Sequence, residues 1–188
     1  MWRKIMWNWI EAIGINKKNV HEQEIPDGER AHYSKRTIDF EFDYPFGRKE
    51  LYGLAYRTDY DLRKHSEHSG VSLDYVNEET KEKFIPHVIE PSLGVDRTIL
   101  AILLDAYSED ELGEGTRVFL KLKPSIAPVK VAVFPLLKNK PELVKKAREV
   151  FEMIKKEIPQ TMWDDNGNVG KRYRRQDEIG TPFCITVD

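Results

Sequence analysis

One stretch near the middle of the chain constrains the fold more than any other, the segment Glu90-Pro-Ser-Leu-Gly-Val-Asp-Arg97. The apolar residues from Phe84 onward predict a strand that ends at Glu90, and the apolar run after Gly94 predicts a buried helix. The first turn of a helix has free N–H groups and a positive potential, which favour a bound anion. Arg97 lies in that turn, and a guanidinium there can hold a phosphate through two hydrogen bonds. The segment therefore predicts an anion site at a strand-to-helix junction, although an ordinary junction with a surface arginine fits the same short motif.

Patterns before and after this segment predict two kinds of structure. Apolar spacing predicts a helix over 2–13, and alternation predicts a strand over 37–44 that pairs with a strand beginning at Glu50, antiparallel across the Pro45-Phe-Gly turn. A proline-containing linker is expected over 123–128. After it come a β-rich run over 129–136, an amphipathic helix over 141–158 and a strand over 181–188. This order predicts a small βαβ unit with two strands.

Composition excludes several classes of protein. The 188 residues have a net charge of −2, which does not indicate a general nucleic-acid binder, and DNA is not an expected partner. No apolar run approaches the roughly 20 residues that span a bilayer, and the first 15 residues lack the order of a signal peptide. A single cysteine, Cys184, excludes an internal disulfide framework. These features predict a cytoplasmic protein without a membrane partner.

Four further segments decide between the two interpretations of the central motif. Gly-Val-Asp-Arg before a helix resembles motif 3 of class II aminoacyl-tRNA synthetases, and Glu-Pro-Ser-x-Gly-Val-Asp-Arg is typical of the glycyl enzymes. The segments that also resemble glycyl-tRNA synthetases lie in the family's order and cover nearly the whole chain: 31–35, 50–62, 65–70 and 172–184. The chain therefore resembles the later part of a glycyl-tRNA synthetase.

The resemblance implies an α+β fold with two partial domains. Residues 1–123 are expected to form part of the antiparallel catalytic domain of a class II synthetase, the part that carries motif 3. Residues 124–188 are expected to form the first part of a small α/β anticodon-binding domain. The implied activity is ATP-dependent activation of glycine to glycyl-adenylate and transfer to tRNA(Gly), with a homodimer as the intact enzyme.

The resemblance also implies site residues. The expected ATP-binding residues are Glu50, Leu51, Gly94, Val95, Asp96 and Arg97, with Glu50 on the side of the Mg²⁺ that accompanies ATP. The expected glycine-binding residues are Glu90, Pro91, Ser92, Leu93 and Gly94, and Glu90 and Arg97 are expected to be catalytic. The basic cluster Lys171, Arg172, Tyr173, Arg174 and Arg175 is expected to contact tRNA, although a charge run is also typical of a solvated face with internal ion pairs.

The match is incomplete in ways that leave alternatives open. Motifs 1 and 2 of the class have no counterpart among these residues, so we expect a fragment or one half of a split enzyme, inactive by itself. Tyr56 stands where the family more often has Asn or Asp. A non-catalytic synthetase-like accessory subunit and an RNA-binding module are the alternative functions.

Three other features point to structure and not to chemistry. His65 and His68 have the spacing of metal ligands, but no cysteine lies near and a third ligand is not visible. Cys184 lies in an apolar strand without a histidine partner, which predicts a buried, unreactive thiol. Neither a P-loop nor a dinucleotide-binding motif is present in the sequence.

Overall fold

The structure is a computed structural model that describes residues 1–112 and 115–188. Contacts divide the chain into a first unit, Met1–Ile10 with Asn16–Ala101, and a second unit, Glu11–Ile15 with Ile102–Asp188. This division falls inside a helix, whereas the expected boundary near Lys123 concerns two family domains and stays a prediction. Among the residues described, no helix is long and apolar enough to cross a membrane.

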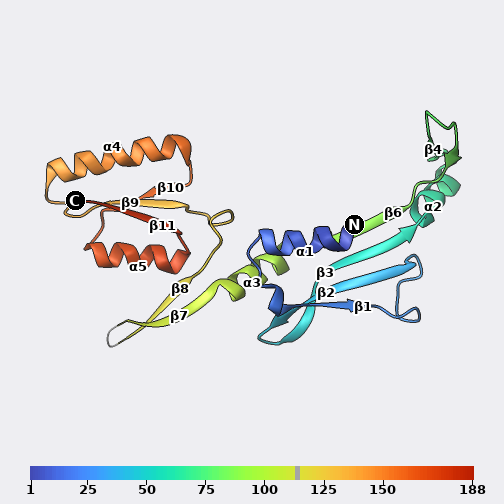
Figure 1. The fold of residues 1–188 in the computed structure, drawn as a ribbon, viewed down its shortest axis with the longest axis horizontal. Helices are drawn as coiled ribbons and strands as arrows, with labels where there is room; N and C mark the ends of the chain where they lie inside the picture. The colour runs from blue at the N-terminus through green and yellow to red at the C-terminus, as the bar shows by residue number, and fades with distance from the viewer. Residues whose placement is uncertain (113–114) are drawn as a thin grey trace. The chain divides into compact units, whose positions relative to one another are not determined.

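The first unit is built on a four-stranded antiparallel sheet in the order β1-β2-β3-β6 (Figure 1). Its strands are β1 Val20–Glu24, β2 Arg36–Tyr44, β3 Gly47–Thr58 and β6 Val88–Leu93. The predicted pairing of 37–44 with the strand that contains Glu50 is confirmed, because β2 and β3 are antiparallel neighbours. Their register shifts between Phe40 and Glu41, where β3 contributes an extra residue.

Alternation along β2 gives the sheet one apolar and one polar face. Ile38, Phe40 and Phe42 are buried, whereas the residues between them are partly exposed. The predicted N-terminal helix is confirmed as α1, Trp2–Ala12, and it covers the apolar face with Met6 and Ile10 buried. The ring of Trp7 meets the ring of Phe40 edge to face at a centroid distance of 5.6 Å. The polar face is thereby left for function.

Short elements surround this sheet. They are the 3₁₀ turn η1 Lys17–Asn19, the helix α2 Tyr60–Ser69, and a small hairpin of β4 Tyr75–Val76 with β5 Lys83–Phe84. The two strands of this hairpin pair Tyr75 with Phe84 and Val76 with Lys83. Helix α2 ends at Gly70, which has a φ of 71° and so takes the left-handed conformation that glycine favours.

The helix after Gly94 is confirmed as α3, Val95–Ala106, but the prediction that it is buried is wrong. Only Ala101 and Ala106 are buried, whereas Val95 is 73% exposed and Ile99 is 52% exposed. A helix that is apolar on nearly all sides is buried only when other elements cover each side. Among the described residues, no element covers the side of α3 that carries Val95 and Ile99.

The second unit contains a hairpin and a three-stranded parallel sheet. The hairpin pairs β7 Tyr107–Leu112 with β8 Gly115–Leu120 in antiparallel fashion. The sheet has the order β10-β9-β11, with β9 Val131–Pro135, β10 Thr161–Trp163 and β11 Phe183–Val187.

Helices α4, Pro141–Glu157, and α5, Val169–Ile179, lie on opposite faces of this sheet (Figure 1). The predicted helix over 141–158 is confirmed, and its Phe151 packs in a core with Val131 and Val133. The two predicted strands are confirmed as β9 and β11, and a third strand that was not predicted, β10, follows α4 and pairs with β9. Its three residues are too few for a periodic signal. The observed mixture of antiparallel sheets, helices and a parallel sheet agrees with the predicted α+β class in its coarse form.

Helix α5 carries the basic cluster, and its two ends are defined locally. Asn168 caps the start by accepting a hydrogen bond from the Lys171 N–H at 2.9 Å. Gly180 follows the end with a φ of 75°. A Cβ at Gly180 would lie 2.7 Å from Leu122 Cδ1, so this position requires glycine for space as well as for conformation.

Candidate functional site

The polar face of the first unit's sheet brings together residues from three strands. The register places two rows of three residues across it, Asp39–Gly53–Ser92 and Thr37–Ala55–Glu90. A Cβ at Gly53 would lie 3.6 Å from Glu50 Oε1 and 3.9 Å from Asp39 Oδ1. Two carboxylate oxygens therefore lie close to Gly53, which shares one face of β3 with the small residue Ala55. A pocket of about 320 Å³ opens on this face and is lined in part by Thr37, Asp39 and Ala55.

Glu90 is held in place by Arg57. Its Oε2 accepts a hydrogen bond from Arg57 Nη1 at 2.7 Å. Two further N–H groups of Arg57 donate to Asp61, at 2.7 and 2.6 Å, and the guanidinium lies 3.8 Å from the centre of the Tyr33 ring. Asp61 forms a bidentate contact with Arg57 and so balances most of the positive charge of the guanidinium. The remaining N–H group of Arg57 orients the Glu90 carboxylate. The hydrogen bond to Asp61, followed by the one to Glu90, holds the pKa of Arg57 well above its usual range.

Asp39 lies among other acidic groups on this face. Burial raises the pKa of its carboxyl above the usual aspartate range, and the nearby charges of Glu50 and Glu41 raise it further. The folded state therefore binds the proton of Asp39 more tightly than the unfolded state does. It follows that this residue lowers the stability of the fold as the pH rises through the raised pKa.

We therefore expect Asp39→Asn to stabilise the chain at neutral pH, by no more than about 4 °C in Tm. The difference should shrink as the pH falls toward about 4, where an unperturbed aspartate takes up its proton. Thermal unfolding between pH 4 and 8 measures it. Asp43→Asn is the matched control, because hydrogen bonds from Arg48 and then His21 lower the pKa of Asp43. A lower Tm for Asp39→Asn than for the parent chain at pH 7 would contradict this account.

Arg97 folds back from the first turn of α3 onto β3. Its Nη1 donates to the main-chain oxygen of Glu50 at 2.8 Å and lies 3.6 Å from Glu50 Oε2. The side chains of both residues are about half exposed. A pocket of about 310 Å³ lies here, lined by Tyr44, Phe46, Lys49, Glu50, Arg97 and Leu100. The junction thus places a half-exposed cation, Arg97, and a half-exposed carboxylate, Glu50, in the lining of one pocket together with the aromatic residues Tyr44 and Phe46.

The other predicted residues of this region divide between the two faces of the sheet. Pro91 pairs with Leu54 and Leu93 pairs with Tyr52, so both lie on the face opposite to Glu90 and Ser92. The side chain of Leu51 is buried, with 2% of its surface exposed, which leaves only its backbone for a ligand. Gly94, Val95 and Asp96 form the turn into α3, where the Gly94 oxygen accepts the Thr98 N–H at 3.0 Å.

The predicted tRNA-binding cluster is not a uniform surface. Arg172 is 1% exposed, and its guanidinium donates to the main-chain oxygens of Pro135, Asp165 and Gly167. Arg175 pairs with Asp164 at 2.6 Å, and Arg174 pairs with the exposed Glu178 at 3.2 Å. Internal ion pairs, which the sequence analysis gave as an alternative for this charge run, are therefore present, and Asp177 pairs with Arg117 of β8. The residues left for a surface ligand are Lys171, Tyr173 and Arg174.

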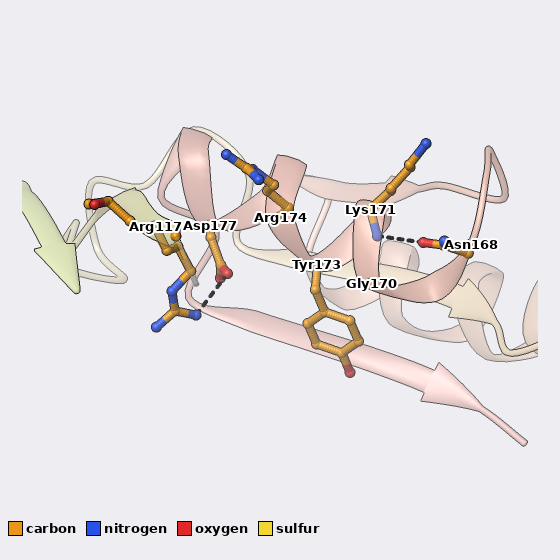
Figure 2. A pocket seen from close by; sticks show the side chains of 9 residues that line it. Arg117, Asn168, Gly170, Lys171, Tyr173, Arg174 and Asp177 are labelled. Carbon is orange, nitrogen blue, oxygen red and sulfur yellow. Dashed lines mark hydrogen bonds and ion pairs between the residues drawn. The ribbon is translucent and has the colours of Figure 1, made fainter. Parts of the chain in front are cut away.

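These three residues line a pocket of about 570 Å³ in the second unit. Figure 2 shows that Lys171 and Arg174 leave α5 on one side, whereas the ring of Tyr173 leaves it on the other. Arg117 of β8 closes one end through its ion pair with Asp177, at 3.1 Å. The pocket therefore lies between helix α5, which carries Lys171 and Arg174, and strand β8, which precedes the predicted linker.

The features that the sequence analysis set aside have local roles in the structure. His65 and His68 lie in α2, and no cluster of three or more metal-ligating side chains exists in the part of the chain described. The Cys184 side chain is partly buried in β11, and burial raises its pKa to about 11. It is therefore a thiol at neutral pH.

Sequence reasoning missed Asp39, Arg57 and Ala55 as site residues. A signal for Asp39 exists, because polar residues at 37, 39, 41 and 43 mark one face of a strand. No signal identifies Arg57, since its contacts with Glu90 and Asp61 depend on how β3 pairs with β6.

Comparison with known proteins agrees with this description. The family described as "Anticodon binding domain" matches residues 130–188. The whole chain is 50% identical to a glycine–tRNA ligase of Caldanaerobacter subterraneus subsp. tengcongensis and 50% identical to that of Clostridium acetobutylicum. It is 47% identical to the glycine–tRNA ligase of Geobacillus thermodenitrificans. In each case the chain spans 40% of the relative's length. The resemblance to glycyl-tRNA synthetases is thereby confirmed along the entire chain.

Proposed function

We propose that this chain forms the motif 3 part of a glycine–tRNA ligase, which activates glycine with ATP and transfers it to tRNA(Gly). One observation carries the proposal: identity of about 50% to such ligases runs through all the residues of the chain, both sites included. Residues 1–123 supply one side of the catalytic site and residues 124–188 the start of the anticodon-binding domain. The intact ligase is a homodimer in the cytoplasm, where tRNA is used.

Glycine is proposed to lie on the polar face beside Gly53 and Ala55. The carboxylate of Glu90 and the hydroxyl of Ser92 accept hydrogen bonds from its ammonium group. Both residues belong to β6 and pair with the two small residues of β3, Glu90 with Ala55 and Ser92 with Gly53. Because glycine has no side chain to recognise, selectivity comes from excluding larger amino acids in a crowded pocket.

ATP is proposed to bind where Arg97 meets β3. Arg97 holds phosphate oxygens, and the backbone of Leu51 with Gly94, Val95 and Asp96 surrounds the nucleotide. For Mg²⁺, the half-exposed carboxylate of Glu50 is a hard oxygen ligand of the right kind. Glu50 would hold the ion from the protein side, together with the phosphates of ATP. Bound there, the ion would neutralise phosphate charge.

The reaction follows from these positions. A carboxylate oxygen of glycine forms a bond to the α-phosphorus of ATP, the bond to pyrophosphate breaks, and glycyl-adenylate results. The terminal adenosine of tRNA then takes the glycyl group and releases AMP. Glu90 fixes the ammonium end of glycine, and Arg97 balances charge on the phosphates, so this chain contributes position and electrostatics. The arginine of motif 2 is not among these residues, so the chain alone should activate glycine poorly.

Glycine-dependent exchange of pyrophosphate into ATP tests the proposal on the whole ligase and on this chain alone. We expect exchange in the ligase and almost none in the chain. A ligase that binds tRNA but shows no glycine-dependent exchange would overturn the proposal and favour the accessory-subunit alternative. Strong exchange by the chain alone would show that it does not need the remaining motifs.

A further inference from the structure

The backbone departs from regular geometry where β3 leads into α2. The register between β3 and β6 shifts between Tyr56 and Thr58, so Arg57 is an extra residue, a β-bulge. Thr58 has a φ of 54°, in the left-handed region that a residue branched at Cβ rarely adopts. Its hydroxyl donates to the main-chain oxygen of Arg57 at 2.7 Å. Strained backbone of this kind persists only where the surrounding contacts determine it, and it concentrates at functional sites.

Three segments meet at the side chain of Arg57. The first turn of α2 supplies Asp61, which accepts two hydrogen bonds from the guanidinium, at 2.7 and 2.6 Å. The loop before β2 supplies Tyr33, whose ring centre lies 3.8 Å from the guanidinium carbon. Strand β6 supplies Glu90, which accepts one hydrogen bond at 2.7 Å. The side chain of Asp61 is 22% exposed and that of Glu90 is 47% exposed, so the enclosed carboxylate lies on one side of Arg57 and the open carboxylate on another.

The loop that carries Tyr33 is attached both to β3 and to α2. The Lys35 N–H donates to the main-chain oxygen of Tyr56 at 2.8 Å, directly beside the bulge. A ring nitrogen of His32 lies 3.0 Å from the hydroxyl of Tyr60, the first residue of α2. The rings of Tyr33 and Tyr60 also lie close together, with their centres 6.3 Å apart. These contacts hold the Tyr33 ring against the guanidinium.

The division of hydrogen bonds determines how much charge Glu90 keeps. Arg57 has one positive charge, and Asp61 contacts it through two N–H groups while Glu90 contacts it through one. The bidentate contact is the stronger of the two and neutralises most of the positive charge. Without the charge of Asp61, the Glu90 carboxylate would balance the guanidinium by itself. Its negative charge would then be used inside the protein and would attract a bound cation less.

We propose that Asp61 and Tyr33 are positioning residues for the glycine site, which act through Arg57 to hold the Glu90 carboxylate in place and to keep its charge available. The bulge places Arg57 between them, and the left-handed turn at Thr58 brings the start of α2 to the guanidinium. The inference rests on the proposed function, because it takes the glycine ammonium to be the cation that Glu90 binds. It gives α2 and the loop over 31–35 a role in substrate binding, although the proposed glycine site contains no residue of either segment.

Four variants of the whole ligase test the inference. Asp61→Asn removes the charge and keeps the shape of the side chain, whereas Asp61→Glu keeps the charge on a side chain one methylene longer. Tyr33→Leu removes the ring that lies against Arg57. Asp59→Asn is the matched control, because Asp59 directly precedes α2 and pairs with Arg63, at 3.9 Å, and not with Arg57. Initial rates of glycine-dependent pyrophosphate exchange give the KM for glycine and for ATP, and thermal unfolding checks that each variant is folded.

We expect Asp61→Asn to raise the KM for glycine about tenfold, because an interaction with a charged group weakens. Tyr33→Leu should raise it about threefold through loss of the cation–π contact. The KM for ATP should stay within about twofold in both, and Asp61→Glu and Asp59→Asn should resemble the unmodified ligase in both constants.

An unchanged KM for glycine in folded Asp61→Asn overturns the inference, and so does an equal rise in both KM values, which a general disturbance of the fold would cause. A defect in Asp61→Glu as large as that in Asp61→Asn would overturn it as well, because the charge would then not be what matters. If Asp61→Asn does not fold, the same comparison of the two KM values in Tyr33→Leu decides. Absence of glycine-dependent exchange in the unmodified ligase is a different result, which overturns the proposed function before any variant is compared.

Discussion

Arg172→Met is expected to destabilise the second unit by about 3 kcal/mol or more. The guanidinium is 1% exposed and joins three segments, the end of β9 through the Pro135 oxygen, the turn through the Asp165 and Gly167 oxygens, and α5 itself. Methionine fills similar volume but donates no hydrogen bond. Three main-chain oxygens would then be left without this donor inside the protein, which is the costly outcome.

The measurement is denaturant unfolding of the chain, with amide hydrogen exchange of residues 131–134 to assign the loss to the second unit. Arg174→Met on the same helix is the matched control. The Arg174 side chain is 65% exposed and its pair with Glu178 is on the surface, so its loss should cost less than about 1 kcal/mol. Equal destabilisation by the two substitutions would contradict the role given to Arg172.

The difference between these two arginines marks what the sequence analysis could not predict. In the sequence, 171–175 is a run of charge, and a run of charge usually indicates a solvated face. The structure shows a helix whose residues 172 and 176 are buried, one turn apart on one face. Asn168 and Gly180 indicate the two ends of that helix in the sequence. Its buried face consists of polar residues, however, so apolar periodicity does not identify which side of the helix is buried.

Strong periodicity explains where prediction succeeded. The alternation over 37–44 and the spacing over 2–13 each define a face without knowledge of the partner, and both elements are confirmed. These patterns do not show whether another element packs against the apolar face, and α3 accordingly has the composition of a buried helix but an exposed surface. Prediction of the candidate site from the sequence is limited in the same way. The motif from Glu90 to Arg97 is visible in the sequence, whereas Arg57, which orients Glu90, is brought to it only by strand register.

Glu90→Gln is expected to raise the KM for glycine in the ligase about tenfold to a hundredfold, while the KM for ATP stays within about twofold. Glutamine keeps the shape of the side chain but removes the charge that the proposal places against the glycine ammonium. A hydrogen bond to a charged group contributes roughly 1.5–3 kcal/mol, which corresponds to this range. The contact with Arg57 does not prevent Glu90 from binding the glycine ammonium. Asp61 balances most of the positive charge of Arg57, so the negative charge of Glu90 remains available for a second cation.

Initial rates of pyrophosphate exchange, with glycine and ATP varied in turn, separate the two constants. Glu67→Gln is the matched control, since Glu67 is also an exposed glutamate of the first unit with one cationic partner, Lys64 at 2.7 Å. It should change neither KM. If Glu90→Gln raised both KM values equally, the residue would act on the fold of β6 and not on the ammonium group. If it changed neither, the glycine ammonium would have to bind elsewhere on the polar face, with Asp39 the next carboxylate along the same sheet.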